Sequence, residues 1–128
     1  MATRKKILVI DEDPDTVRII SDQFQDNHCD ILNATDGLDG LEKARNERPD
    51  CIILDIRAPK LNGFKVCRFL KFDETCKHMP VILLSTNNDP SDIALGKEVG
   101  ADLLMTKPVD NDAFRDAVLT RLGLDDQA

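Results

Sequence analysis

The chain has 128 residues and a mass of 14.3 kDa, which suits one domain around a single hydrophobic core. Its 24 acidic side chains outnumber its 17 lysines and arginines, so the formal net charge is −7. This balance and the lack of Trp and Tyr argue against binding nucleic acid. With no apolar run approaching about 18 residues and no signal-like N-terminus, we expect a cytoplasmic protein that does not bind membranes.

Five short apolar runs, beginning at residues 7, 29, 51, 81 and 102, alternate with helix-like stretches and predict a repeating strand–helix pattern with a parallel sheet. The runs at 7–10, 51–54 and 81–84 are apolar throughout, as in strands buried on both faces. Those at 29–34 and 102–106 carry polar residues and are expected at the sheet edges. These edges agree with a flavodoxin-like α/β fold of strand order 2-1-3-4-5 with five surrounding helices, an order taken from that fold class.

Apolar residues recur at helical spacing between the runs, for example Val66, Phe69 and Leu70. Asp13 before a proline predicts the cap of the first helix, and either Asp110 or Asn111 is expected to cap the last. Gly100 is expected to end the fourth helix.

The cysteines are predicted to be buried, reduced thiols, because they show no CxxC spacing and mostly lie within apolar patterns. This interpretation covers all four: Cys29, Cys51, Cys67 and Cys76.

Ionisable and hydroxyl side chains gather where the predicted strands end. The first strand ends in Asp11-Glu12-Asp13, the third in Asp55, the fourth in Ser85-Thr86 and the fifth in Thr106-Lys107-Pro108. Ligands of open parallel sheets bind beyond the carboxyl ends of the strands. Each group taken alone also fits a plain structural role: an acidic turn capping a helix, a loop carboxylate, a turn hydroxyl or a solvated lysine.

The first and third strands are neighbours in the expected order, so Asp11, Glu12 and Asp55 are expected to converge in one pocket. Two carboxylates about 4 Å apart repel by roughly 4 kcal/mol at an effective dielectric constant of about 20, so the pocket needs cations. Lys107 supplies one positive charge. A hard divalent ion bound by carboxylates, waters and a phosphate oxygen is the natural second, which describes Mg²⁺.

Four segments carry a resemblance to a known family: ILVIDEDP, CIILDIRAPKLNGF, PVILLST and GADLLMTKPV. In this order they resemble the acidic pair, the phosphoacceptor strand with its D-x-x-x-P-x-x-x-G loop, the hydroxyl strand and the lysine-proline segment of response-regulator receivers. The match runs over essentially the entire chain, so residues 1–128 are expected to form a single receiver domain.

The resemblance implies that Asp55 accepts a phosphoryl group from a histidine kinase, a phosphotransfer protein or a small acyl phosphate. The implied catalytic residues are Asp55, Ser85 and Lys107. The implied Mg²⁺ ligands are Asp11, Glu12, Asp55 and the backbone carbonyl of Arg57. It further implies a cis peptide before Pro108, and Pro59 and Gly63 as the residues that shape the loop after Asp55.

The implied output is a conformational switch at the face of the fourth helix and fifth strand, recognised by a separate downstream protein. Any enzymatic activity would be limited to self-phosphorylation and autodephosphorylation. The chain ends soon after the last predicted helix, without room for a DNA-binding output domain. Both a stand-alone receiver and one excised from a longer protein stay open.

Several residues depart from the family pattern. Glu12 stands where an aspartate is usual, Thr86 where a small alanine is usual, and Leu104 where a switch aromatic is common, while Arg57 lies two residues after Asp55. These departures motivate an alternative, a degenerate receiver that acts as a phosphorylation-independent interaction module.

Two enzyme classes fit the motifs less well. VIDEDPDT approaches the D-x-D-x-T/V motif of haloacid-dehalogenase-like phosphatases, but its threonine comes one place late and the chain has no cap domain or clear later acidic pair. A dinucleotide-binding fold lacks its G-x-G-x-x-G motif.

Overall fold

The computed structural model describes residues 4–87 and 89–124, and in this part of the chain five parallel strands form one sheet of order β2-β1-β3-β4-β5. The strands are β1 (Lys5–Ile10), β2 (Cys29–Ala34), β3 (Cys51–Asp55), β4 (Val81–Ser85) and β5 (Leu103–Thr106). The flavodoxin-like order and the two predicted edge strands are therefore confirmed. Residues 1–3 and 125–128 of the expected domain lie outside the described residues.

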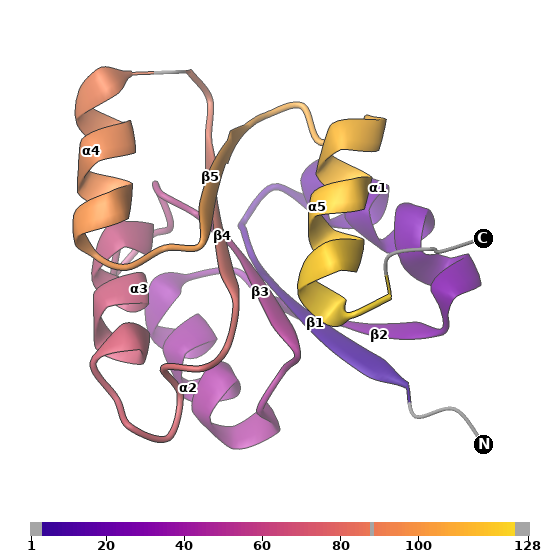
Figure 1. Ribbon diagram of the computed structural model, residues 1–128, viewed down its shortest axis with the longest axis horizontal. Coiled ribbons are helices and arrows are strands. Elements are labelled where there is room, and N and C mark those ends of the chain that lie inside the picture. Colours follow the sequence, from indigo (N-terminus) through magenta and orange to yellow (C-terminus); the bar gives the residue numbers. More distant parts are fainter. Residues whose placement is uncertain (1–3, 88, 125–128) are drawn as a thin grey trace.

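Helices cover both faces of the sheet, which explains the uninterrupted apolar runs 7–10, 51–54 and 81–84 in the three inner strands (Figure 1). α1 (Pro14–Phe24) and α5 (Asp112–Leu122) pack on one face. α2 (Gly37–Glu47), α3 (Gly63–Lys71) and α4 (Pro90–Glu98) pack on the other. A short 3₁₀ turn, η1 (Gln25–Asn27), follows α1.

Side-chain caps start the first and last helices where the sequence predicted them. The Asp13 carboxylate accepts a hydrogen bond from the backbone N–H of Asp15 at 3.0 Å. Of the two candidates for α5, Asn111 is the cap, and its side chain accepts from the N–H of Phe114 at 2.8 Å. Gly100 follows the end of α4 with a φ of +87°, a conformation that favours glycine.

All four cysteines are buried free thiols, as predicted. Burial raises the pKa of the Cys51 and Cys67 thiols to about 12, so both stay protonated and act as small apolar side chains.

Among the described helices, none combines the length and the apolar character that a membrane crossing requires.

Candidate functional site

The sheet register brings the ends of β1 and β3 together. Ile10 is paired with Leu54, so Asp11 directly after β1 and Asp55 at the end of β3 reach the same edge. The N–H of Asp11 donates to the carbonyl of Ala34 at 3.0 Å, which extends the pairing with β2 and fixes the Asp11 backbone. Local strand pairing thus positions both carboxylates.

Lys107 joins the two carboxylates. Its Nζ lies 2.9 Å from Asp11 Oδ2 and 3.1 Å from Asp55 Oδ2. The N–H of Lys107 also donates to the Ser85 carbonyl at 2.8 Å, and a cis peptide links Lys107 to Pro108, as the resemblance implied. The structure therefore assembles three of the predicted residues, from the ends of β1, β3 and β5, in one charged cluster.

The pKa values of the groups in this cluster reflect how deeply they are buried and how close they lie to one another. The side chain of Asp11 is 1% exposed, and burial raises the pKa of its carboxyl although the N–H of Asp13 donates to Oδ1 at 2.9 Å. Burial also acts to lower the pKa of Lys107, but the carboxylates of Asp11 and Asp55 outweigh it and the net direction is upward. The cluster therefore keeps its ammonium group charged at neutral pH.

The donor set fits a hard divalent cation. Asp11 Oδ2 is buried and, within the described residues, receives no aligned hydrogen bond even though Lys107 lies at ion-pair distance. The unused lone pairs of a buried carboxylate oxygen are ligands that Mg²⁺ prefers, and one or two carboxylates suffice for it.

The other predicted metal ligands lie differently. Glu12 is exposed, and in residues 4–87 and 89–124 no three His, Cys, Asp or Glu side chains form a metal-binding group. Arg57 lies in the β3–α3 loop, where its N–H donates to Asp55 Oδ1 at 2.9 Å and holds that carboxylate. The structure thus brings two of the predicted carboxylates together, not three.

Ser85 is buried at the end of β4, but its hydroxyl is turned toward its own loop. Ser85 Oγ accepts from the N–H of Asn87 at 3.0 Å and donates to the carbonyl of the same residue. The predicted phosphoryl-binding hydroxyl is therefore occupied by the β4–α4 loop.

The loop after Asp55 depends on two close backbone contacts. A Cβ at Gly63 would lie 2.5 Å from the Asp55 carbonyl oxygen, which explains the glycine of the D-x-x-x-P-x-x-x-G pattern. The N–H of Gly37, at the start of α2, donates to the Pro59 carbonyl at 2.9 Å, and a Cβ there would lie 1.7 Å from the Leu61 carbonyl oxygen. Sequence reasoning missed Gly37, because its partner is distant in the chain.

Sequence reasoning also missed Asn33 in β2. Its side-chain amide donates to the carbonyls of Val9 at 2.9 Å and Asp11 at 3.3 Å, and so ties β2 to the backbone that carries the buried carboxylate. The available signal was an asparagine inside an otherwise apolar run beside the acidic segment.

A groove of about 410 Å³ opens beside the cluster, between α1 and the segment after β5. It is lined by Asp13, Asp15, Thr16, Ile19, Thr86, Lys107, Pro108 and Val109. Lys107 thus belongs both to the charged cluster and to the wall of an accessible groove.

Comparison with known proteins identifies the family. The profile described as "Response regulator receiver domain" matches residues 7–119. The chain belongs to this family. It is therefore a receiver domain of two-component systems. Its sequence is 38% identical over 104 residues to the transcriptional regulatory protein PhoP of Bacillus subtilis, and 36% identical over 109 residues to the protein PilH of Pseudomonas aeruginosa. These matches cover 81% and 85% of the chain, respectively.

The solved structure of the chemotaxis response regulator CheY4 of Vibrio cholerae resembles this receiver domain with a TM-score of 0.82 and 30% identity, covering 94% of this chain and 99% of that one. The relatives differ in length. The receiver domain spans 42% of PhoP and 90% of PilH, so the first relative contains more than a receiver and the second little else.

Proposed function

We propose that Asp55 accepts a phosphoryl group in a Mg²⁺-dependent reaction and that this modification switches a protein-interaction surface. One observation carries the proposal: the Asp55 carboxylate stands at the end of an inner strand, paired with Lys107, beside the buried carboxylate of Asp11. This arrangement joins a nucleophile to fixed positive charge at the edge where open parallel sheets bind ligands.

In the proposed step, one Asp55 oxygen attacks the phosphorus of the donor. A new P–O bond forms, and the bond between phosphorus and the leaving group breaks with its electron pair going to the leaving group. The product is an acyl phosphate on Asp55. Lys107 is placed to balance the charge of the phosphoryl oxygens, and phosphoryl transfer depends mainly on such positioning and charge stabilisation.

Asp11 and Asp55 would hold the metal ion, together with the Arg57 backbone carbonyl and with Glu12 acting directly or through water. When bound, Mg²⁺ neutralises charge on the phosphoryl oxygens and orients them. Asp11 Oδ2 supports this role, because it is a buried oxygen that, among the described residues, has the Lys107 ion pair but no hydrogen bond, so it has lone pairs left for a cation.

Ser85 is proposed to link the modification to the switch. A phosphoryl oxygen on Asp55 competes for the Ser85 hydroxyl, which now bonds the backbone of Asn87. Exchange of Asn87 for the phosphoryl group releases the β4–α4 loop and changes the face of α4 and β5. Leu104 of β5 packs beside Gly96 of α4 on that face, where the family pattern commonly has an aromatic residue.

The proposed partners are a histidine kinase or phosphotransfer protein, which delivers the phosphoryl group at the groove beside Lys107, and a downstream protein that reads the α4–β5 face. We place these reactions in the cytoplasm, where buried free thiols such as the four found here remain reduced.

A second candidate function is a phosphorylation-independent interaction module. It is favoured by the exposed Glu12, since among the described residues only the carboxylates of Asp11 and Asp55 pair with Lys107.

Incubation with acetyl phosphate or phosphoramidate and Mg²⁺, followed by intact mass measurement, separates the two. We expect the mass of one added phosphoryl group, and none after Asp55→Asn. Unmodified wild-type protein under the same conditions would support the interaction module instead.

A further inference from the structure

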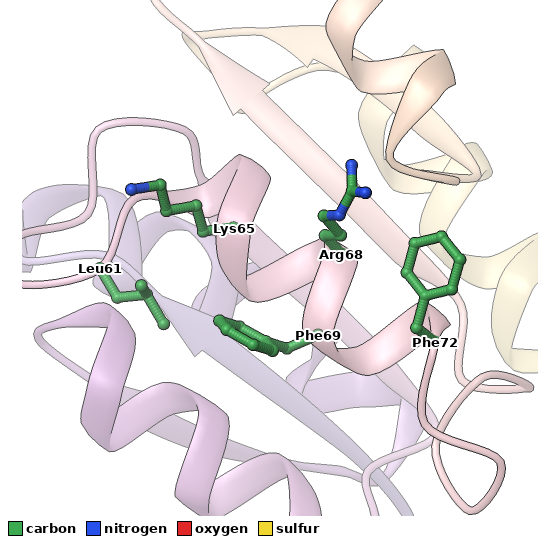
Figure 2. Close-up of a pocket in the computed structure, with 5 residues that line it drawn as sticks. All are labelled: Leu61, Lys65, Arg68, Phe69 and Phe72. Carbon is green, nitrogen blue, oxygen red and sulfur yellow. The ribbon is translucent and has the colours of Figure 1, made fainter.

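The outward side of α3 carries a groove that the phosphorylation chemistry does not use. It has a volume of about 640 Å³ and is lined by Leu61, Lys65, Arg68, Phe69 and Phe72. Figure 2 shows these side chains along α3, with Lys65 and Arg68 extending away from Phe69. Lys65, Phe69 and Phe72 follow one another at intervals of four and three residues, and Arg68 is adjacent to Phe69. These four side chains are all exposed, so they lie on the solvent side of the helix.

Two phenylalanines in this groove are unusually exposed. Phe69 is 51% exposed and Phe72 is 71% exposed, whereas Phe24 and Phe114 are buried and pack edge to face. Exposed aromatic rings clustered in a concave site are typical of protein-binding surfaces, where such rings act as anchors.

The charge of the groove is one-sided. Neither Lys65 nor Arg68 forms an ion pair with any described residue, and no acidic residue lines the groove. The Arg68 guanidinium lies 5.2 Å from the ring centre of Phe72, which combines charge and aromatic surface. The same two cations also line a smaller groove of about 270 Å³ that reaches α4 through Leu95.

We propose that the α3 groove binds an acidic amphipathic helix of another protein. The nine residues of α3 extend about 14 Å at the helical rise of 1.5 Å per residue, which matches between two and three turns of a bound helix. Apolar anchors at helical spacing would contact Phe69 and Phe72, and flanking carboxylates would pair with Lys65 and Arg68. Charge complementarity therefore favours an acidic ligand at this groove, although the chain as a whole carries a net charge of −7.

Two other occupants fit less well. A symmetric dimer of this chain through the groove would place Lys65 and Arg68 of one copy against the same cations of the other. An anionic membrane presents a flat surface, which does not enter a concave groove of about 640 Å³, whereas a helix can lie along it.

The groove is built independently of the acceptor chemistry. Its charged and aromatic residues belong to α3 or follow it directly, and only Leu61 lies in the loop after Asp55. The proposed interaction therefore does not depend on phosphorylation, and Asp55→Asn is expected to bind the helix as the wild type does.

The test is a titration of ¹⁵N-labelled full chain with two designed helical peptides, followed by heteronuclear NMR. Both peptides carry the same leucine stripe over about three turns, one with flanking glutamates and one with lysines at those positions. The variants are Arg68→Glu and Phe69→Ala, with Lys97→Glu and Ile93→Ala on the exposed side of α4 as matched controls.

We expect the acidic peptide to shift the amide signals of residues 61–72, and the basic peptide to shift none. Arg68→Glu and Phe69→Ala should each weaken binding about tenfold or more, as truncated anchors do, while the α4 controls bind as the wild type. Added salt should weaken the complex.

Several outcomes would overturn the proposal. These are equal binding of both peptides, no shifts at residues 61–72, or unchanged affinity after Arg68→Glu. A dimer seen in sedimentation that Phe69→Ala dissociates would also overturn it, because it would assign the groove to a second copy of the chain. Binding to phosphatidylserine vesicles that Phe69→Ala abolishes would assign the groove to a membrane instead.

Discussion

Replacing Lys107 with methionine tests the electrostatic design of the site. The substitution keeps a long, flexible side chain but removes the ammonium group that lies between two carboxylates. Asp11 and Asp55 then face each other without a counter-charge, one of them fully buried. We expect the folded state to be destabilised and phosphorylation to be lost.

The size of the effect follows from the geometry. The two Oδ2 atoms lie 2.9 Å and 3.1 Å from the same nitrogen, so they can be no more than about 6 Å apart. Two unit charges at that distance repel by about 3 kcal/mol at an effective dielectric constant of about 20. The wild type has the same repulsion, but there the attraction of Lys107 for both carboxylates offsets it. Removing Lys107 leaves the repulsion uncompensated, so the free energy of unfolding should fall by about 3 kcal/mol at neutral pH, within the range expected when one partner of a buried ion pair is removed.

Urea unfolding measures this loss of stability when it is carried out on the wild type, Lys107→Met, Asp55→Asn and the double variant. Because Asp55→Asn removes one of the two repelling charges, the double variant should recover most of the loss. Lys97→Met, an exposed lysine on α4, is the matched control and should change stability by less than about 0.5 kcal/mol.

The pH dependence gives a second check. Because the folded-state pKa of Lys107 is raised above its ordinary 10.5, its stabilising effect is full below that pH and is lost as the pH rises through the raised value. The difference in unfolding free energy between wild type and Lys107→Met should therefore disappear as the pH rises through the raised pKa of Lys107. An unfolding free energy for Lys107→Met within about 0.5 kcal/mol of wild type at neutral pH, or a loss that Asp55→Asn leaves unchanged, would refute the reasoning.

Three further substitutions have defined outcomes. Burial raises the pKa of the Asp11 carboxyl above its usual 3.8, so the stability of Asp11→Asn relative to wild type should increase as the pH rises through this interval. Urea unfolding across pH measures this change, and Mg²⁺ affinity should fall. Gly37→Ala should cost about 1–3 kcal/mol, because the new Cβ would overlap the Leu61 carbonyl, and NMR should show shifts in the loop after Asp55. Asn111→Ala removes the cap that accepts from Phe114 and should lower the unfolding free energy by about 1 kcal/mol, as measured by thermal unfolding.

The sheet was predictable because burial on both faces leaves an uninterrupted apolar run, as at Ile7–Ile10, and because polar residues in 29–34 marked an edge. The charged cluster was predictable for a related reason. Parallel strands end at one edge, so Asp11, Asp55 and Lys107 had to meet once the order was known.

The remaining features depend on contacts that a linear pattern does not encode. The Ser85 hydroxyl is hydrogen-bonded to the backbone of Asn87 in its own loop, and Gly37 is required by a backbone that approaches from the β3–α3 loop. Helical spacing grouped Phe69 with Val66 and Leu70, yet Phe69 is half exposed while the other two are buried. A period identifies a helix but does not fix how wide its buried stripe is.

The most direct test of the central claim is to locate the phosphoryl group. Protein treated with acetyl phosphate and Mg²⁺ is reduced with borohydride, which converts an aspartyl phosphate to homoserine, and peptides are then sequenced by tandem mass spectrometry. We predict homoserine at Asp55 alone, and none when Mg²⁺ is removed. Homoserine at Asp11 or Asp13, or at no position, would contradict the assignment of Asp55 as the acceptor.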